Sequence, residues 1–306
     1  MLQPWKYLRG VDRGQFLLSL AGLHTAGAAM RMNALEGLLG VTRSSERMPV
    51  LFLGHGNPMN AIEENTFTAG FRAMAREIPR PQAILCVSAH WETRGTWVTA
   101  MERPRTIHDF SGFPKALYEV QYPAPGSPAL AAETKDLLSD TSVGLDQRWG
   151  LDHGAWSVVK HLYPEADVPV VQLSLDRDMS AEQHYALARR LAPLRDKGVL
   201  VLGSGNLVHN LRLVAWDRLE ETGYAYDWAQ EARERMNTLI LKGDHRALID
   251  HRAQGPAFQL AIPTPEHYLP LMYALALKRN DEHAALFNDQ AVAGSITMTS
   301  VVIRDA

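Results

Sequence analysis

Apolar runs of strand length alternate along the chain with segments whose apolar residues recur at helical spacing. The runs are residues 48–54, 83–90, 168–174 and 198–203. Continuous apolar runs of this length are typical of strands that are buried on both faces of a parallel sheet. Residues 63–78 and 181–195 lie after the first and third runs and have the spacing of amphipathic helices. This order predicts an α/β fold with a central, mostly parallel sheet flanked by helices.

The other patterned segments add elements around this core. Predicted helices cover residues 127–139 and 227–241, with a short one near 245–251, and predicted strands cover 97–101 and 295–303. The last strand alternates and is rich in β-branched residues, so we expect it at an edge of the sheet. Residues 106–128 are rich in aromatic residues, Pro and Gly. Long ordered loops of this kind often cover functional sites.

Composition excludes several classes of function. The 306 residues carry a formal net charge of -3, which provides no basic field for nucleic acid. Cys86 is the single cysteine, so a disulfide within the chain and a zinc–thiolate cluster are both excluded. The 12 histidines instead favour metal ligation by imidazole and carboxylate groups. The length allows one large α/β domain or two smaller ones.

The first 47 residues differ from the rest. A basic start at Arg13, a modest apolar segment and a stretch of small residues resemble a twin-arginine export signal. Gly14 stands where a second arginine is required, and the apolar segment is too short to span a bilayer. The alternative is an amino-terminal helix or a decayed presequence in a cytoplasmic protein. We expect a cytoplasmic protein without a membrane span, with export to the periplasm as the alternative.

Histidines recur where the predicted strands end. His55 lies between two glycines after the first run, His90 closes the second, and His209 follows the glycine turn after the fourth. His267 lies in a proline-rich turn, and His153 opens a predicted helix. The carboxyl ends of parallel strands meet at one edge of a sheet, where open α/β sheets bind ligands. Repeated placement at that edge therefore predicts a shared metal site.

Several motifs that contain these histidines occur in an order typical of one family. They are Leu53-Gly-His55-Gly-Asn-Pro-Met59, Ser88-Ala-His90-Trp91, Ile107-His-Asp109-Phe110, Tyr122-Pro-Ala-Pro-Gly126, Asp152-His153-Gly154, Gly205-Asn-Leu-Val-His209-Asn210 and Pro263-Thr-Pro-Glu-His267-Tyr268-Leu-Pro-Leu271. From about residue 48 to the end, the chain resembles the DOPA 4,5-dioxygenase family, which comprises class III extradiol ring-cleavage enzymes of the LigB type.

The resemblance implies a single α/β catalytic domain of LigB or phosphorylase-like type over residues 48–306, preceded by an extension over residues 1–47. It also implies a mononuclear non-haem iron(II) site that zinc can occupy, with a catechol such as DOPA and O2 as substrates. Such a site needs three protein ligands and open positions for the catechol and O2. The expected product is a ring-opened semialdehyde.

The resemblance also assigns roles to residues. It implies that His55, His90 and His267 are metal ligands, with Glu266 as an alternative third ligand. His209 is either a fourth ligand or the catalytic base that moves the catechol proton. The expected substrate contacts are His153, which is also a catalytic candidate, and His108, Phe110 and Tyr268. Asp152 is expected to cap the helix that follows it.

Two other functions remain open from the sequence. Three histidines around an ion with a free position also suit a zinc hydrolase. A non-enzymatic binding protein similar to the Memo proteins is the second alternative.

Overall fold

An eight-stranded sheet forms the centre of the computed structural model, which describes residues 47–219 and 221–305. Its strands lie in the order β4-β3-β5-β2-β6-β1-β10-β7. Their bounds are β1 Val50–Gly54, β2 Ala83–Thr93, β3 Thr96–Thr99, β4 Val143–Asp146, β5 Val170–Asp176, β6 Val199–Gly205, β7 Glu282–Phe287 and β10 Ser300–Asp305. The short strands β8 (Ala291–Val292) and β9 (Ile296–Thr297) pair separately.

The centre of the sheet is parallel and its flanks are mixed. Strands β1, β6, β2 and β5 run parallel to one another. Antiparallel pairs join β10 to β1, β7 to β10, and β3 to β5. The predicted α/β fold with a mostly parallel sheet is therefore confirmed.

Side chains of the central strands enter two separate cores. On β1, Val50 and Phe52 pack into one core, while Leu51 and Leu53 pack into the other. All four side chains are fully buried. This double burial is the reason why the parallel strands are continuous apolar runs in the sequence instead of alternating ones.

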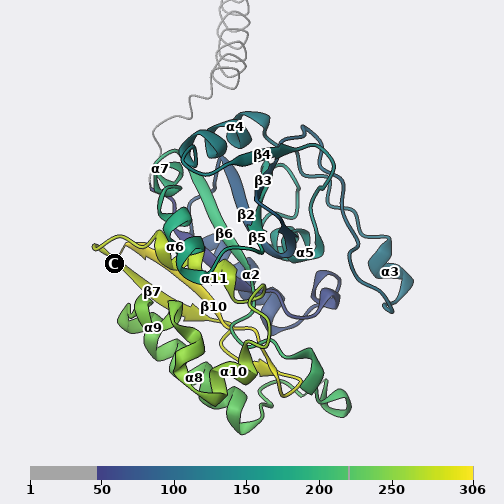
Figure 1. The fold of residues 1–306 in the computed structure, drawn as a ribbon. Helices are drawn as coiled ribbons and strands as arrows, with labels where there is room; N and C mark the ends of the chain where they lie inside the picture. The colour runs from purple at the N-terminus through teal and green to yellow at the C-terminus, as the bar shows by residue number, and fades with distance from the viewer. Residues whose placement is uncertain (1–46, 220, 306) are drawn as a thin grey trace, which may run out of the picture. The chain divides into compact units, whose positions relative to one another are not determined.

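Helices cover both faces of the sheet (Figure 1). Helices α2 (Thr66–Glu77) and α5 (His153–Leu162) contribute to one core. The other core receives α4 (Pro128–Leu137), α6 (Ala181–Arg189), α7 (Ala192–Arg195), α8 (Asp227–Lys242), α9 (His245–Ile249), α10 (Pro256–Ala261) and α11 (Leu269–Ala276). The remaining short helices are α3 (Lys115–Tyr118), η1 (Pro58–Ala61), η2 (Leu211–Leu213), η3 (Trp216–Arg218) and η4 (His251–Gln254).

The structure corrects three expectations. The last strand, β10, is not at an edge, because β7 pairs with its outer side. The helix expected over residues 181–195 is divided into α6 and α7, with Pro193 in the first turn of α7, since proline cannot continue the hydrogen bonding of a helix interior. Strand β2 does not end at His90 but continues to Thr93 after a register shift between Val87 and Glu92.

None of the helices in residues 47–219 and 221–305 is long and apolar enough to cross a membrane. The export-signal resemblance and the predicted boundary at residue 47 concern residues 1–46, which lie outside the described part of the chain. The compartment therefore stays a prediction.

His184 connects α6 to its surroundings through both ring nitrogens. Its Nδ1 atom lies 2.9 Å from the Tyr273 hydroxyl, and its Nε2 atom lies 3.1 Å from the carbonyl oxygen of Asp176. Burial lowers the pKa of His184 to about 4. The unfolded chain binds this proton near pH 6.5. The stability that His184 contributes is thus complete above about pH 6.5 and is lost as the pH falls toward 4.

We therefore predict that the free energy of unfolding of His184→Gln falls less steeply with decreasing pH than that of the wild type. The difference in slope should be about 1.4 kcal/mol per pH unit between roughly pH 6 and 4.5, which corresponds to one proton. Urea denaturation at a series of pH values measures both slopes. Equal slopes would contradict the buried, neutral state of this histidine.

Candidate metal centre

Five histidines meet at the carboxyl ends of the parallel strands. His55 directly follows β1, His90 lies near the end of β2, and His209 follows β6. His153 is the first residue of α5, and His267 precedes α11. Backbone hydrogen bonds join these segments: the His55 N–H donates to the Gly205 carbonyl at 3.1 Å, and the Asn206 N–H donates to the His267 carbonyl at 2.8 Å.

The rings of His55, His90 and His267 form a nearly equilateral triangle. Their centroids are 5.0 Å apart for His55 and His90, 5.3 Å for His55 and His267, and 5.0 Å for His90 and His267. A metal–nitrogen bond of about 2.1 Å places two imidazole centroids about 4.5–5.2 Å apart around one ion, depending on the angle between the bonds. The three rings thus have the separations of imidazoles that surround one cation.

The other two rings are arranged differently. His209 is stacked on His267, with centroids 3.5 Å apart and an interplanar angle of 10°. Parallel stacked rings direct their in-plane lone pairs along parallel lines, so they do not converge well on one ion. The ring of His153 lies 3.8 Å from that of His90 and 5.8 Å from that of His55.

Ligand atoms in two groups lie within 4.8 Å of one another. One group is His55, His90 and His153, and the other is His209, Glu266 and His267. A buried group of three histidines is therefore present, as the sequence predicts, but it includes His153 in place of His267. The ring triangle connects the two groups, because the His267 centroid is 5.3 Å from that of His55 and 5.0 Å from that of His90, close to the 5.0 Å between His55 and His90.

Each ring of the triangle is bonded or paired through its Nδ1 atom. The Nδ1 atom of His55 is 3.0 Å from the Ser204 hydroxyl. That of His90 is 3.5 Å from a carboxylate oxygen of Asp109, and that of His267 is 3.1 Å from a carboxylate oxygen of Glu266. Histidines that bind metals commonly donate their second ring N–H to such partners. The Nε2 atoms are left as the atoms that can bind a metal.

The Nε2 atoms of His55 and His90 face each other at 3.2 Å. If both rings carry their proton on Nδ1, as the Ser204 and Asp109 contacts favour, two lone pairs point at each other and repel. A cation between them removes this repulsion. Two nitrogens that bind one ion with bonds of about 2.1 Å lie about 3.0–3.4 Å apart, so the observed separation fits a metal ion.

Burial keeps these imidazoles neutral. It is the largest cause that holds the pKa of His55 and of His267 well below the ordinary value, and neighbouring histidines lower both further. Burial and His153 lower the pKa of His90 to about 3. Burial also lowers the pKa of His209 to about 4. Neutral imidazoles have the free lone pairs that metal binding requires.

Asp109 joins the aromatic loop to the start of α5. One of its carboxylate oxygens accepts from the backbone N–H of His153 at 2.8 Å, and the other lies 2.9 Å from the Nδ1 atom of the same residue. Burial raises the pKa of Asp109, but the contacts with His153 and His90 outweigh it, so the pKa is below its ordinary value. Asp109 is thus a carboxylate that bonds to the first N–H of α5 and lies beside two rings of the site.

Glycines allow the backbone to come this close to the rings. A Cβ atom on Gly154 would lie 2.5 Å from the Ser88 hydroxyl oxygen and 2.7 Å from the Cδ2 atom of His90. A Cβ atom on Gly54 would lie 2.6 Å from the backbone of Met298. Gly56 has a φ of +62°, a conformation that residues with a side chain rarely adopt. The start of α5 and the turn after β1 therefore both depend on glycine.

The expected cap of α5 is confirmed. Asp152 accepts a hydrogen bond from the Ala155 N–H at 3.0 Å, and its side chain is fully buried. It also accepts from the Ser88 hydroxyl at 2.6 Å and from the Gln172 amide at 2.7 Å. These bonds fasten the helix start to β2 and β5.

Of the other residues expected to contact the substrate, Phe110 lies beside the histidine group, whereas His108 and Tyr268 make contacts elsewhere. The Phe110 ring lies edge-on to His153, with centroids 5.5 Å apart, at the border of the histidine group. His108 packs against Phe110, and its Nε2 atom is 3.0 Å from the Val120 carbonyl, so it fastens the loop. Tyr268 does not fit the substrate role expected from the sequence, because its side chain is 1% exposed and its hydroxyl donates to the Leu248 carbonyl at 2.9 Å.

Ser204 and Asp109 are two residues of the site that the sequence alone does not predict. Asp109 lies within one of the recognised motifs, so its place in that motif was an available signal. Ser204 ends an apolar run and has no such signal. The contact of either residue with a ring nitrogen depends on side-chain packing, which hydrophobic periodicity does not contain.

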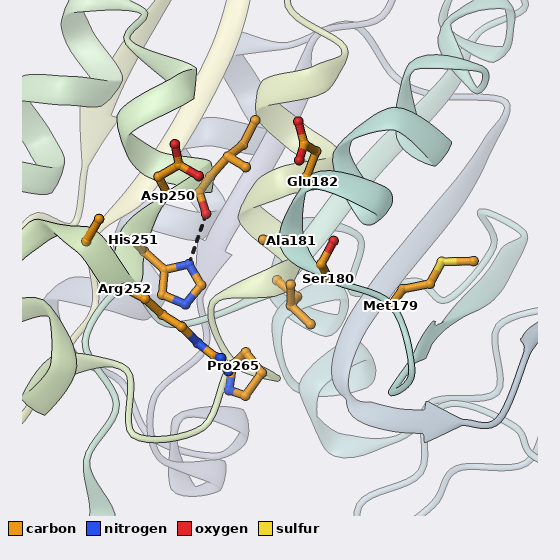
Figure 2. Close-up of a pocket in the computed structure, with 11 residues that line it drawn as sticks. Met179, Ser180, Ala181, Glu182, Asp250, His251, Arg252 and Pro265 are labelled. Atoms are coloured by element: carbon orange, nitrogen blue, oxygen red, sulfur yellow. Dashed lines mark hydrogen bonds between the residues drawn. The ribbon is translucent and has the colours of Figure 1, made fainter.

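A separate cleft lies close to the His267 segment. Its volume is about 360 Å³, and it lies between the start of α6, residues 249–253 and Pro265 (Figure 2). His251 lines it and makes a hydrogen bond of 3.3 Å with the Ile249 carbonyl. None of the five clustered histidines lines this cleft.

Comparison with known proteins agrees with the arrangement of these residues. A family described as the catalytic LigB subunit of aromatic ring-opening dioxygenase matches residues 49–302. The chain belongs to this LigB family. It is therefore an oxidoreductase of the aromatic ring-opening dioxygenase type.

Individual relatives of this LigB chain cover most of its length. A protein of Escherichia coli (strain K12) named 4,5-DOPA dioxygenase extradiol is 47% identical over 267 residues, which are 86% of this chain and 97% of the relative. A protein of the same name from Beta vulgaris is 38% identical and covers 81% of this chain and 94% of its own. A crystal structure of an uncharacterised protein from Escherichia coli K12 has a TM-score of 0.73 and 42% identity and covers 84% of this chain and 100% of its own.

We predict that Gly154→Ala lowers stability and weakens metal binding together. Alanine favours helices by about 1 kcal/mol over glycine, but its methyl group would push against Ser88 and His90, and overpacking of this kind typically costs about 1–3 kcal/mol. Urea denaturation and zinc titration measure the two effects. A variant as stable as the wild type that also binds zinc equally well would contradict the close packing of α5 on β2.

Proposed function

We propose that this LigB chain cleaves a DOPA-like catechol by extradiol ring opening with O2 at a mononuclear iron(II) site that zinc can also occupy. The observation that carries the proposal is the 3.2 Å approach of two imidazole Nε2 atoms, on rings that form a triangle with His267. The names of the Escherichia coli and Beta vulgaris relatives support the choice of substrate.

In this proposal His55, His90 and His267 hold the metal through Nε2. Their nearly equal ring separations and their three Nδ1 partners favour this set over the one that contains His153. Three neutral nitrogen ligands on one side of the ion leave positions for other ligands. Iron(II) held there by His55, His90 and His267 would supply open coordination positions and redox chemistry for a catechol and O2.

His209 acts as the base that takes a catechol proton and later returns it. Its ring is stacked on His267 and so is poorly directed at the same ion. Burial lowers its pKa to about 4, so at neutral pH the ring is neutral and has a free lone pair. This assignment chooses the base over the fourth ligand, the two alternatives that the sequence leaves open.

His153 binds a substrate oxygen. Asp109 accepts from its backbone N–H at 2.8 Å, and a carboxylate oxygen faces its Nδ1 atom at 2.9 Å before substrate arrives. Its Nε2 atom is then available to hydrogen-bond an oxygen of the catechol. The Phe110 ring beside it supplies an apolar wall for the aromatic substrate.

The test is anaerobic loading of the protein with iron(II), followed by addition of DOPA and then air. We expect O2 uptake and a yellow ring-opened product from the wild type. His90→Ala should abolish both signals, and His283→Ala is the matched control because His283 is exposed on β7, outside the histidine group. Hydrolytic activity with zinc and no O2 uptake would favour the zinc hydrolase instead. Unchanged signals in His90→Ala would show that His90 does not hold the metal, and a wild type that gives neither signal would favour a non-enzymatic role.

A second variant tests the role of His209. We predict that His209→Gln lowers kcat by about 10²–10⁴-fold, the usual contribution of a general base, while the protein retains its bound iron. Steady-state kinetics and metal analysis of the same preparation give both quantities. A loss of iron that parallels the loss of activity would show His209 to be a ligand and would contradict the assigned role.

A further inference from the structure

We propose that Ser204 is a positioning residue that fixes the protonation of the His55 ring and directs its Nε2 atom at the metal ion. This inference rests on the proposed function in taking His55 as a metal ligand. Ser204 does not face the ion itself, because its hydroxyl contacts the Nδ1 side of the His55 ring and the Gly154 carbonyl.

The contact between Ser204 and His55 is set by strand register. Strands β1 and β6 pair in parallel, with Leu53 opposite Ser204 and Gly54 opposite Gly205. His55 follows immediately, and its N–H donates to the Gly205 carbonyl at 3.1 Å. The Ser204 side chain is fully buried and that of His55 nearly so. Both partners are therefore held by the sheet, and water does not compete for the contact.

The single proton of the Ser204 hydroxyl is already committed. It is donated to the Gly154 carbonyl at 2.5 Å, and a carbonyl has no proton to give in return. The serine oxygen therefore offers only lone pairs to the His55 Nδ1 atom, 3.0 Å away. A neutral imidazole has one N–H, and here it must be on Nδ1. The Nε2 atom is left with its lone pair free.

This arrangement suppresses a competing state of the metal-free site. If the proton of His55 moved to Nε2, it could donate a hydrogen bond to the Nε2 atom of His90, which is 3.2 Å away. That bond would occupy both metal-binding atoms at once. The acceptor contact from Ser204 favours the opposite tautomer, so the two lone pairs stay available for a cation. Ser204 thus disfavours a hydrogen bond between the Nε2 atoms of His55 and His90 that would block metal binding.

The matched set of variants is Ser204→Ala, Ser204→Thr and Ser174→Ala. Threonine retains the hydroxyl. Ser174 is also a fully buried serine on a central strand, but its hydroxyl lies 2.7 Å from that of Thr93 and accepts from the Trp97 N–H at 2.8 Å. Ser174→Ala therefore removes a buried hydroxyl without removing a contact to a clustered histidine.

Two measurements test the proposal. Long-range nitrogen–proton NMR correlations of ¹⁵N-histidine-labelled, metal-free protein report which nitrogen of His55 carries the proton, with His55→Asn used for assignment. We expect Nδ1–H in the wild type and in Ser174→Ala, and Nε2–H in Ser204→Ala. Competition with a chromophoric chelator should show zinc affinity reduced about 10–100-fold in Ser204→Ala. It should be near the wild-type value in Ser204→Thr and Ser174→Ala.

An Nε2–H tautomer in the wild-type protein would overturn the proposal, and this result does not require any variant to fold. Unchanged zinc affinity in a folded Ser204→Ala variant would also overturn it. Failure of the proposed function is a different result: a wild type that shows the expected tautomer and binds metal, but does not open catechols, would refute the ring cleavage and leave the role of Ser204 intact.

Discussion

Neutral imidazoles whose lone pairs converge on one point are stabilised by a cation at that point, and the rest of the site is built around this constraint. The Nε2 atoms of His55 and His90 are 3.2 Å apart, and burial holds the pKa of both rings far below the ordinary value. Protonating either ring would relieve the repulsion between the two Nε2 atoms, but at neutral pH these low pKa values make protonation unfavourable in free energy. A metal ion relieves it without charging either ring, and the carboxylates of Asp109 and Glu266 add negative charge close by.

The parallel sheet gathers groups that are far apart in sequence. Strands β1, β6 and β2 are neighbours, and the histidines at their carboxyl ends meet at one edge. Helix α5 then closes this edge, because Gly154 allows it to approach β2 and Asp152 bonds to Ser88 and Gln172. The aromatic loop is joined to the same helix through Asp109, which accepts a hydrogen bond from the first N–H of the helix, that of His153. The site thus depends on the packing of α5 as much as on the strands.

The sequence predicts the parallel core and the meeting of the histidines, for a physical reason. Burial on both faces produces uninterrupted apolar runs, and histidines after such runs must lie at the same edge of a parallel sheet. The position of β10 could not be predicted in this way, since an alternating β-branched segment suits both an edge and an inner strand. Its neighbour β7 begins with Glu282, whose buried carboxylate pairs with Arg195. Because a charged residue is not typical of a buried strand, the sequence pattern does not predict β7.

The roles of individual rings were less predictable than their meeting. Whether His209 is a ligand or a base depends on its stacking against His267, and whether Tyr268 faces substrate depends on which side of the turn before α11 packs into the core. Side-chain orientation of this kind is fixed by tertiary contacts, and these contacts do not produce a periodic pattern in the sequence. The same holds for Ser204, whose hydroxyl is directed by a carbonyl 50 residues away in the chain.

The most direct test of the central claim is X-ray absorption spectroscopy of the wild-type protein loaded with one equivalent of iron(II) without oxygen. Imidazole rings give a characteristic scattering pattern that allows them to be counted. We expect three imidazoles at about 2.1 Å from each iron. One imidazole or none, with oxygen ligands in their place, would show that the histidines do not share an ion and would contradict the account.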